Sequence, residues 1–358
     1  MNPGNESVDE LQGEDREFYE HHNIKVDKGQ VMMRIDKFIM IRISNTTRTK
    51  IQNCCTAGSV LVNGKPVKSN YRIKPFDEIS IVLTVPPRDV EVVPENIPID
   101  IVYEDEYIAL VNKKPGMVVH PGYGNYRGTL VNALAFHFKN LPTSKTRIDQ
   151  DVSLERPGLV HRIDKNTSGI VIIAKTEIAM TKLAKDFFDH TIDRKYVALV
   201  WGNVKEDEGT ITANVGRDLK NRKVMTVFPG EEHGKHAVTH FKVIERFGFV
   251  TLVECILETG RTHQIRVHFK SIGHPLFNDN EYGGDKVLKG LNTATYKKFI
   301  HNCFTMCPRH ALHAKTLGIT HPITGKKLLF ESKIPDDMQS VIDKWRKYVE
   351  KKEFHVED

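Results

Sequence analysis

One short segment of the chain places a lone carboxylate among cations, between two apolar runs. It reads Gly158-Leu-Val-His-Arg-Ile-Asp-Lys-Asn-Thr-Ser-Gly-Ile-Val-Ile-Ile-Ala-Lys175, and Asp164 is its only acid. A carboxylate beside cations such as Arg162 and Lys165 stays ionised, so Asp164 is available as a nucleophile. Taken alone, the segment is also typical of a structural turn with exposed cations. A single carboxylate does not supply the pair that glycoside hydrolysis requires.

The apolar runs around Asp164 predict strands that hold the polar turn rigidly at the rim of a sheet. Similar strand-like runs and intervening helical patterns recur along the second part of the chain. The strand-like runs are 107–112, 169–174, 196–201, 249–257 and 312–319, and the helical patterns are 129–138, 177–189, 262–272 and 336–351. Strands and helices do not alternate regularly, which favours an α+β fold on a mixed or antiparallel central sheet over a doubly wound fold.

Composition divides the chain into four parts. Residues 1–30 are acidic and poor in apolar side chains, and predict a disordered acidic tail. Residues 31–84, the basic module, form a small α+β unit. Residues 85–98 contain four prolines and predict an extended linker. Residues 99–358 are long enough for one large domain, and because it contains Asp164 it is the candidate catalytic domain.

The basic module carries a net charge of +6, from nine basic and three acidic residues, while residues 1–30 carry −5. Apolar spacing predicts one helix from Ile35 to Ile43 and a second over 48–57. The Asn63-Gly64 pair between apolar runs predicts a hairpin, and a strand follows over 77–83. Small basic modules often bind polyanions, although charge alone is equally compatible with a solvated surface.

The basic module resembles the small RNA-binding domain of ribosomal protein S-four. The resemblance rests on Arg34-Ile-Asp-Lys-Phe-Ile, Thr47-Arg-Thr-Lys-Ile-Gln, Gly58-Ser-Val-Leu-Val-Asn-Gly-Lys and Asp77-Glu-Ile. Cations on one face of its two helices would contact RNA phosphates, which gives affinity without sequence choice. The candidate contacts are Arg34, Lys37, Arg42, Arg48 and Lys50.

The segment around Asp164 is similar to the signature of the RluA/RluD-type pseudouridine synthases, with Ile163 where that family usually has leucine. Further segments match the family's motifs in the family's order. They are Lys113-Lys-Pro-Gly-Met-Val-Val-His-Pro-Gly122, Lys195-Tyr-Val-Ala-Leu-Val-Trp-Gly202, Thr259-Gly-Arg-Thr-His-Gln-Ile-Arg-Val-His268 with Gly273-His-Pro275 and Asp279, and Arg309-His-Ala-Leu-His-Ala314. Together with the basic module, they cover nearly the whole ordered chain.

The resemblance implies the pseudouridine synthase fold and an isomerase that converts uridine to pseudouridine within RNA. The bond from the ring nitrogen to the anomeric carbon breaks, the uracil turns, and carbon five takes the nitrogen's place. Asp164 would attack the uracil or the sugar, or deprotonate the sugar, and these routes stay open. Arg266 would pair with Asp164 and hold it ionised. Tyr196 would stack on the uracil and help to remove the proton from carbon five.

Three more residues are implied to contact the substrate. The target nucleotide must leave the base stack, and Arg162 resembles the residue that fills the vacated place. Ile265 would pack against the uracil, and His161 belongs to the same substrate-binding set. The weaker phosphate-contact candidates are Arg261, Lys113 and Lys165.

No cofactor and no metal are expected, because the reaction conserves atoms and because Cys303 and Cys307 lack the second ligand pair of a zinc site. Two other functions compete with this interpretation. A nucleoside hydrolase would need a second carboxylate near Asp164. A non-catalytic RNA-binding or ribosome-assembly factor should have lost Asp164, Tyr196 or Arg266, and all three are present.

The expected partner is RNA, above all ribosomal RNA in the precursor of the large ribosomal subunit. We expect no obligate protein partner and a monomer. No apolar run approaches the ~20 residues that a membrane span needs. Five cysteines, an odd number, and an acidic N-terminus without the features of a signal peptide predict a cytoplasmic protein.

Overall fold

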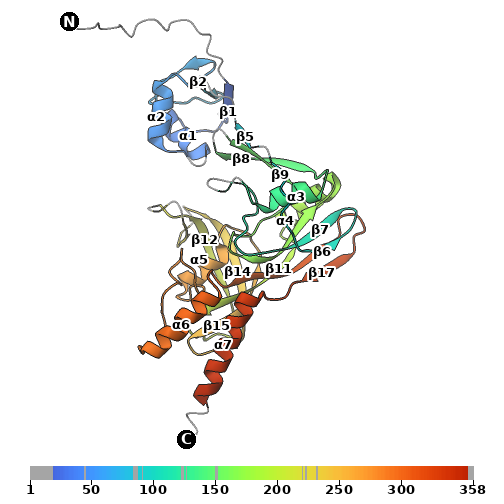
Figure 1. Ribbon diagram of the computed structural model, residues 1–358. Helices are drawn as coiled ribbons and strands as arrows, with labels where there is room; N and C mark the ends of the chain where they lie inside the picture. Colours follow the sequence, from blue (N-terminus) through green and yellow to red (C-terminus); the bar gives the residue numbers. More distant parts are fainter. Residues whose placement is uncertain are drawn as a thin grey trace, which may run out of the picture. The chain divides into compact units, whose positions relative to one another are not determined.

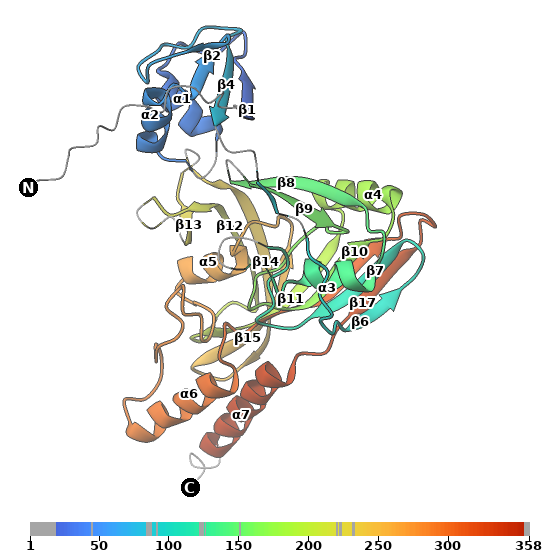
Figure 2. The same ribbon diagram turned by 45° about the horizontal axis from the view of Figure 1, so that its top comes forward.

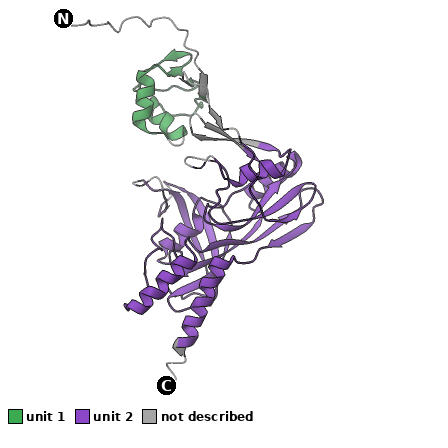
Figure 3. Ribbon diagram, viewed as in Figure 1, with its two compact units in different colours: residues 1–91, 145–155 green, residues 92–144, 156–358 purple. Residues whose placement is uncertain are grey.

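The computed structural model describes residues 19–43, 46–83, 88–90, 92–121, 125, 127–149, 152–219, 221, 224–230 and 233–353 (Figure 1). The chain divides into two compact units (Figure 3). The smaller unit comprises Met1–Glu91 and Lys145–Glu155, and the larger unit comprises Val92–Ser144 and Arg156–Asp358. The short segment 145–155 therefore groups with the smaller unit, although it lies within the range 99–358 of the expected catalytic domain.

The smaller unit contains the helices and the hairpin expected for the basic module. Its elements are β1 (Tyr19–Lys25), α1 (Ile35–Arg42), α2 (Arg48–Thr56), β2 (Val60–Val62), β3 (Lys65–Pro66) and β4 (Glu78–Leu83). The Thr47 side chain accepts a hydrogen bond from the Lys50 backbone N–H and so caps α2. Asn63 and Gly64 have φ angles of 51° and 76°, as a tight hairpin turn requires. The expected order of two helices, hairpin and strand is confirmed.

The first strand corrects the expected extent of the tail. Tyr19–Lys25 form β1, which pairs antiparallel with β4 at the edge of a four-stranded sheet of order β1-β4-β2-β3. Val26 follows β1 and is buried in the core of the module. The alternation of apolar residues in this strand is too short to stand out from its acidic surroundings. Residues 1–18 of the expected tail lie outside the described residues.

The expected linker contains one short strand. Arg88–Val90 form β5, which pairs in parallel with β9 (Val152–Pro157). β9 lies between β5 and β8 (Thr143–Asp149) in a three-stranded sheet. Outside Arg88–Val90, the described part of the segment forms no regular element, and the extended linker stays a prediction.

A ten-stranded mixed sheet forms the centre of the larger unit. Its strands are β6 (Ile101–Glu104), β7 (Ile108–Lys113), β10 (Ser168–Ala174), β11 (Asp193–Trp201), β12 (Glu208–Arg217), β13 (Met225–Phe228), β14 (Lys235–Arg246), β15 (Val250–Leu257), β16 (Leu312–Thr320) and β17 (Lys327–Glu331). The order is β13-β12-β14-β15-β11-β16-β10-β7-β6, and β17 also pairs with β16. Only β10 and β16 are parallel among these described pairs. The predicted α+β fold on a mixed sheet is confirmed.

Helices pack on both faces of this sheet. They are α3 (Leu130–His137), α4 (Glu177–Phe188), α5 (Gln264–Ser271), α6 (Ala294–Met306) and α7 (Asp336–Glu353). Alternate residues of β11 separate the two faces: Tyr196 packs with side chains of α3 and α5, whereas Trp201 packs with α6 and α7. Figure 2 shows α6 and α7 side by side. No helix in the described ranges is long and apolar enough to span a membrane.

Candidate active site

A cavity of about 520 Å³ opens in the larger unit, and its wall contains Asp164. The wall is formed by the turn before β10, the start of β11, the end of α4 and the start of α5. The six residues expected to act in the reaction or to contact the substrate line it, namely Asp164, Arg162, His161, Tyr196, Ile265 and Arg266. Of the weaker phosphate-contact candidates, Arg261 also lines it, whereas Lys113 and Lys165 do not. The fold thus brings together residues that lie up to about a hundred positions apart in the chain.

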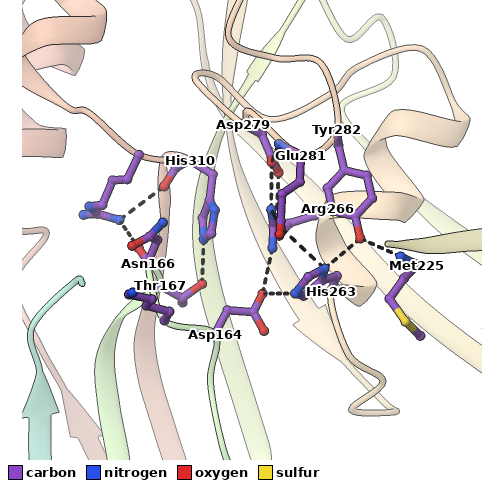
Figure 4. Close-up of polar contacts among 12 residues, drawn as sticks. Asp164, Asn166, Thr167, Met225, His263, Arg266, Asp279, Glu281, Tyr282 and His310 are labelled. Atoms are coloured by element: carbon purple, nitrogen blue, oxygen red, sulfur yellow. Dashed lines mark hydrogen bonds and ion pairs between the residues drawn. The ribbon is translucent and has the colours of Figure 1, made fainter. Parts of the chain in front are cut away.

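The turn that carries Asp164 is fixed to the start of β16. Thr167 donates its backbone N–H to the Asp164 carbonyl oxygen, and its hydroxyl lies 3.0 Å from His310 Nε2 (Figure 4). The Arg309 guanidinium donates to the carbonyl oxygen of Asn166 at 3.0 Å. Gly169, with a φ of 118°, permits this close approach, because a Cβ there would overlap the carbonyl of Ala314. The Asp164 side chain stays 20% exposed to the cavity.

Lys113 also supports this turn, from below the surface. It is only 1% exposed, and its ammonium donates to the carbonyl oxygens of Lys114, Met117 and Lys165 at 2.9–3.0 Å. Burial lowers the pKa of Lys113 to about 7. The weaker expectation that Lys113 contacts RNA phosphate is therefore wrong, because its donors are used inside the fold.

Arg266 on α5 is bound more closely by Asp279 than by Asp164. Its Nε and Nη2 donate to the two carboxylate oxygens of Asp279 at 2.7 and 2.8 Å, whereas Nη1 lies 3.4 Å from Asp164 Oδ2. Nη2 also pairs with Glu281, and the guanidinium lies 4.7 Å from the centre of the Tyr282 ring (Figure 4). Burial lowers the pKa of Arg266, but the bonds to Asp279 outweigh it, so the pKa is raised overall.

His263 is a second neighbour of Asp164 that sequence reasoning did not single out. It stands before α5 in the left-handed region, with a φ of 56°. Its Nε2 lies 3.9 Å from Asp164 Oδ2, and its Nδ1 lies 2.7 Å from the Tyr282 hydroxyl. The backbone N–H of Met225 donates to that hydroxyl at 3.0 Å. Burial lowers the pKa of His263.

Tyr196 and Ile265 belong to the apolar part of the wall. Tyr196 on β11 is paired with Ala314 of β16 and Cys255 of β15, so its backbone is held on both sides. A bulge at Lys315 of β16 lies beside it. Burial raises the pKa of Tyr196, which keeps its hydroxyl protonated. Both side chains belong to the same core cluster as α3 and α5.

Arg162 is held by a buried histidine from the segment 113–122. His120 places Nδ1 3.0 Å from the Pro121 carbonyl oxygen, which only a protonated Nδ1 can satisfy. Nε2 is then an acceptor, and Arg162 Nη1 donates to it at 2.8 Å. Burial, and Arg162 itself, lower the pKa of His120 to about 4, so the ring is neutral near pH 7. Arg162 as a whole residue is exposed.

His161 is anchored in the protein. Its Nε2 accepts the backbone N–H of Ile172 at 3.0 Å, and its ring stacks on Phe187 with the ring centres 4.5 Å apart. Burial lowers its pKa to about 3. His161 lines the cavity, but these contacts fix the position of β10 against α4, so the ring's Nε2 is not available to a ligand.

The five candidate RNA contacts of the basic module divide into two kinds. Arg34 and Arg48 donate to the fully buried carboxylate of Asp36, whose pKa is held well below its usual range by Arg34 in particular. Arg42 pairs with Asp27 at 3.0 Å. Within the described residues, Lys37 and Lys50 form no ion pair and are exposed.

The described part of the chain contains no group of three or more His, Cys, Asp or Glu side chains that could hold a metal ion. Cys55, Cys255, Cys303 and Cys307 are free thiols there. The expectation of a reaction without metal or cofactor stays a prediction.

Comparison with known proteins gives consistent matches. Residues 107–271 match the family model described as RNA pseudouridylate synthase, and residues 33–79 match the S4 domain. An uncharacterised RNA pseudouridine synthase of Chlorobaculum parvum is 45% identical, over 90% of this chain and 97% of that protein. The ribosomal large subunit pseudouridine synthase D of Zymomonas mobilis is 40% identical, over 88% and 95% respectively. Human RNA pseudouridylate synthase domain containing 4 has a similar fold, with a TM-score of 0.50 at 20% identity over 69% of this chain and 93% of that one.

Proposed function

Because this chain belongs to the RNA pseudouridine synthase family, we propose that it isomerises uridines of large-subunit ribosomal RNA, with Asp164 as the essential carboxylate. Membership makes it an isomerase that acts on RNA, and its N-terminal module is an S4 domain. The observation that supports the role of Asp164 is its position. It is the one carboxylate in the described wall of the cavity, and it is partly exposed there beside Arg266, His263 and Tyr196.

The reaction moves a bond without changing the composition of the nucleotide. The bond between N1 of uracil and C1′ of ribose breaks, a bond between C5 and C1′ forms, C5 loses a proton and N1 gains one. Asp164 acts on the uracil or on the sugar, as a nucleophile or a base. Arg266 Nη1, 3.4 Å away, places a positive charge beside the carboxylate that acts in either role.

The flipped uracil lies in this proposal against Tyr196 and Ile265. Both side chains are held rigidly, Tyr196 by strands on either side and Ile265 by α5, so the slot exists before the RNA binds. A flat ring pressed against apolar side chains excludes water from the reacting atoms. The Tyr196 hydroxyl, protonated near pH 7, is the group we assign to assist proton transfer at C5.

Arg162 takes the place that the flipped nucleotide leaves. Extraction of a nucleotide costs a few kcal/mol of stacking energy, and a planar guanidinium recovers part of it because it stacks on bases and contacts phosphate together. The hydrogen bond from Arg162 to neutral His120 directs the side chain before the RNA binds. This removes part of the entropic cost of ordering a long side chain.

Ribosomal RNA is the proposed target because two relatives carry it in their names. The Zymomonas mobilis and Nitrosomonas europaea proteins, 40% and 37% identical, are ribosomal large subunit pseudouridine synthases. We propose the precursor of the large ribosomal subunit as the substrate, a monomeric enzyme without an obligate protein partner, and the cytoplasm as its location. The free thiols are compatible with a reducing compartment.

Mapping of pseudouridine in cells tests this proposal. A strain with Asp164→Asn as its only copy is compared with wild type, and with Asp207→Asn as a control at an exposed carboxylate on the larger unit. We expect particular pseudouridines of the large-subunit RNA to disappear with Asp164→Asn and to persist with Asp207→Asn. If every pseudouridine persists with Asp164→Asn, the catalytic role is wrong. If the lost positions lie in transfer RNA, only the proposed target is wrong.

A further inference from the structure

Phe188 is an exposed aromatic residue in the wall of the candidate active-site cavity. It is the last residue of α4, and it is 82% exposed. Its neighbour Phe187 is held between the ring of His161 and the guanidinium of Arg194, at 4.5 and 5.7 Å. The described residues give Phe188 no such aromatic or cationic neighbour. It therefore presents a free aromatic face beside the site.

The charges of the same wall favour an anionic occupant. Five arginines line the cavity, and Asp164 is the one carboxylate in its described wall. Of the five, only Arg266 forms an ion pair with a carboxylate of the described residues. The Nε atoms of Arg156 and Arg194 are buried without a hydrogen-bond partner there. An apolar protein surface placed over this wall would leave those cations without compensation, which is costly.

RNA fits both observations. Its phosphates compensate arginines, and its bases stack on exposed aromatic rings. Tyr196 and Ile265 come from β11 and α5 and lie beside Asp164, whereas Phe188 comes from α4. The cavity therefore has an aromatic surface besides the slot that we assign to the target uracil.

We propose that Phe188 is a stacking platform for the base of a nucleotide adjacent to the target uridine in the RNA strand. The proposal rests on the proposed function, because it requires an RNA substrate in the cavity. Every base has an aromatic face, so the platform gives affinity and register rather than choice of base. Loss of one stacked base typically weakens binding on the order of tenfold.

Binding measurements with the full chain test the platform. The Asp164→Asn background keeps the RNA unmodified, so the result does not depend on turnover. The ligand is a fluorescein-labelled stem-loop that carries the uridine identified by the mapping above. Phe188→Leu keeps an apolar side chain without the ring, and Phe188→Tyr keeps the ring. Phe136→Leu is the matched control, because Phe136 on α3 is 47% exposed and does not line the cavity.

We expect Phe188→Leu to raise Kd about tenfold, and Phe188→Tyr and Phe136→Leu to leave it within twofold. Two abasic stem-loops each lack one base, that of the nucleotide on the 5′ side or on the 3′ side of the uridine. One of the two should abolish the difference in Kd between the parent chain and Phe188→Leu, because the stacked partner is gone. The proposal is overturned if Phe188→Leu binds the intact stem-loop like the parent, or if its deficit persists with both abasic RNAs.

Two further results separate this proposal from others. If the chain sediments as a dimer that Phe188→Leu dissociates, Phe188 belongs to an interface between copies and the platform is wrong. If the Asp164 mapping shows no lost pseudouridine, the proposed reaction fails, and binding is then measured to total large-subunit ribosomal RNA. Weaker binding by Phe188→Leu, but not by Phe188→Tyr, would leave Phe188 as a residue that stacks on RNA, without the assigned place beside a target uridine.

Discussion

At the scale of single residues, Arg266 pairs with Asp164, as the resemblance implies, but it is bound more closely by Asp279. Arg266 is 3% exposed, so its charge must be compensated inside the protein. Asp279 supplies two hydrogen bonds in the plane of the guanidinium and leaves Nη1 for Asp164. Asp279 thus sets the orientation of the cation beside the candidate catalytic carboxylate.

Asp279→Asn should therefore lower activity strongly. The change removes the buried charge that holds Arg266, and we expect kcat to fall by roughly 10- to 100-fold as well as a loss of stability of about 3 kcal/mol. Single-turnover kinetics and denaturant unfolding measure the two effects. Glu281 is a half-exposed partner of the same guanidinium, so Glu281→Gln should reduce kcat and stability much less. Equal effects of the two variants would contradict the role given to Asp279.

The sequence was sufficient to place the six candidate residues of the catalytic domain in one cavity wall, but not to find their partners. His120, His263 and Asp279 occur in the motifs, and nothing in their spacing shows which side chains they contact. The pairing of Arg266 with Asp279 depends on how the chain returns after α5, and that path is set by tertiary packing. The burial of Lys113 escapes prediction for the same reason, since lysine is seldom buried.

At the scale of elements, the turn that carries Asp164 depends on Arg309. This guanidinium donates to Asp337 at 2.7 and 3.0 Å, and also to the carbonyl of Asn166 and the hydroxyl of Ser168. It therefore links the turn before β10 to α7. Removal of such a network is far more disruptive than loss of a surface ion pair.

Arg309→Met should destabilise the larger unit and displace the turn. We expect a loss of about 3 kcal/mol in the free energy of unfolding, together with a fall in kcat. Asp337→Asn alone should lower the free energy of unfolding by less than Arg309→Met does. The double variant should lower it by less than the sum of the two single losses, because the two residues share one interaction. Denaturant unfolding of the three variants measures the coupling free energy between Arg309 and Asp337. Additive losses would show that Arg309 acts independently of Asp337.

Elements with a strong apolar pattern were predicted well, whereas β12, a strand with few buried residues, was not. The strands β7, β10, β11, β15 and β16 have long buried runs, and all appear where expected. β12 has mostly exposed or half-buried residues, with Ile211 and Val215 as its buried exceptions. Its pairing with β13 and β14 is nonlocal, so the sequence carries little signal for it. The helix α6 was not predicted, although its buried residues recur at helical spacing.

At the scale of the whole molecule, several buried histidines make stability depend on pH. Burial lowers the pKa of His120, His268 and His313 to about 4 and that of His161 to about 3. The unfolded chain has histidine pKa values near 6.5. Between pH 6.5 and pH 4, the unfolded state therefore binds more protons than the folded state, and stability decreases as pH falls.

The thermal midpoint should drop steeply as the pH is lowered from 6.5 to 4. Each histidine that is kept neutral contributes a slope of up to about 1.4 kcal/mol per pH unit in that window. His161→Gln should flatten the profile relative to wild type, because it removes one of these groups. His137→Gln, at an exposed histidine, is the control. A wild-type midpoint that stays constant down to pH 4 would contradict the burial of these rings.

Lys37 and Lys50 of the basic module should contribute to the salt dependence of RNA binding, because they contact RNA phosphates in our proposal. Lys37→Gln with Lys50→Gln removes two cations that no described carboxylate compensates, and should reduce the slope of log K against log salt by about 2. Arg34→Gln should instead destabilise the module, because Asp36 loses its main partner. Fluorescence anisotropy at several salt concentrations, with thermal unfolding, distinguishes these effects. An unchanged slope in the double lysine variant would exclude these lysines from RNA contact.

The hydrogen bond between Thr167 and His310 joins positions 143 residues apart, and Arg309 extends that link to α7. During synthesis, the S4 domain therefore leaves the ribosome well before the residues that support the Asp164 turn. The S4 domain is synthesised first, whereas the support for Asp164 is completed only when α7 has been made. At ~5–20 residues per second, the interval between Asp164 and the end of α7 is roughly 10–40 s. During that time the nascent chain carries an RNA-binding domain, while the turn that holds the candidate catalytic carboxylate is not yet fully supported.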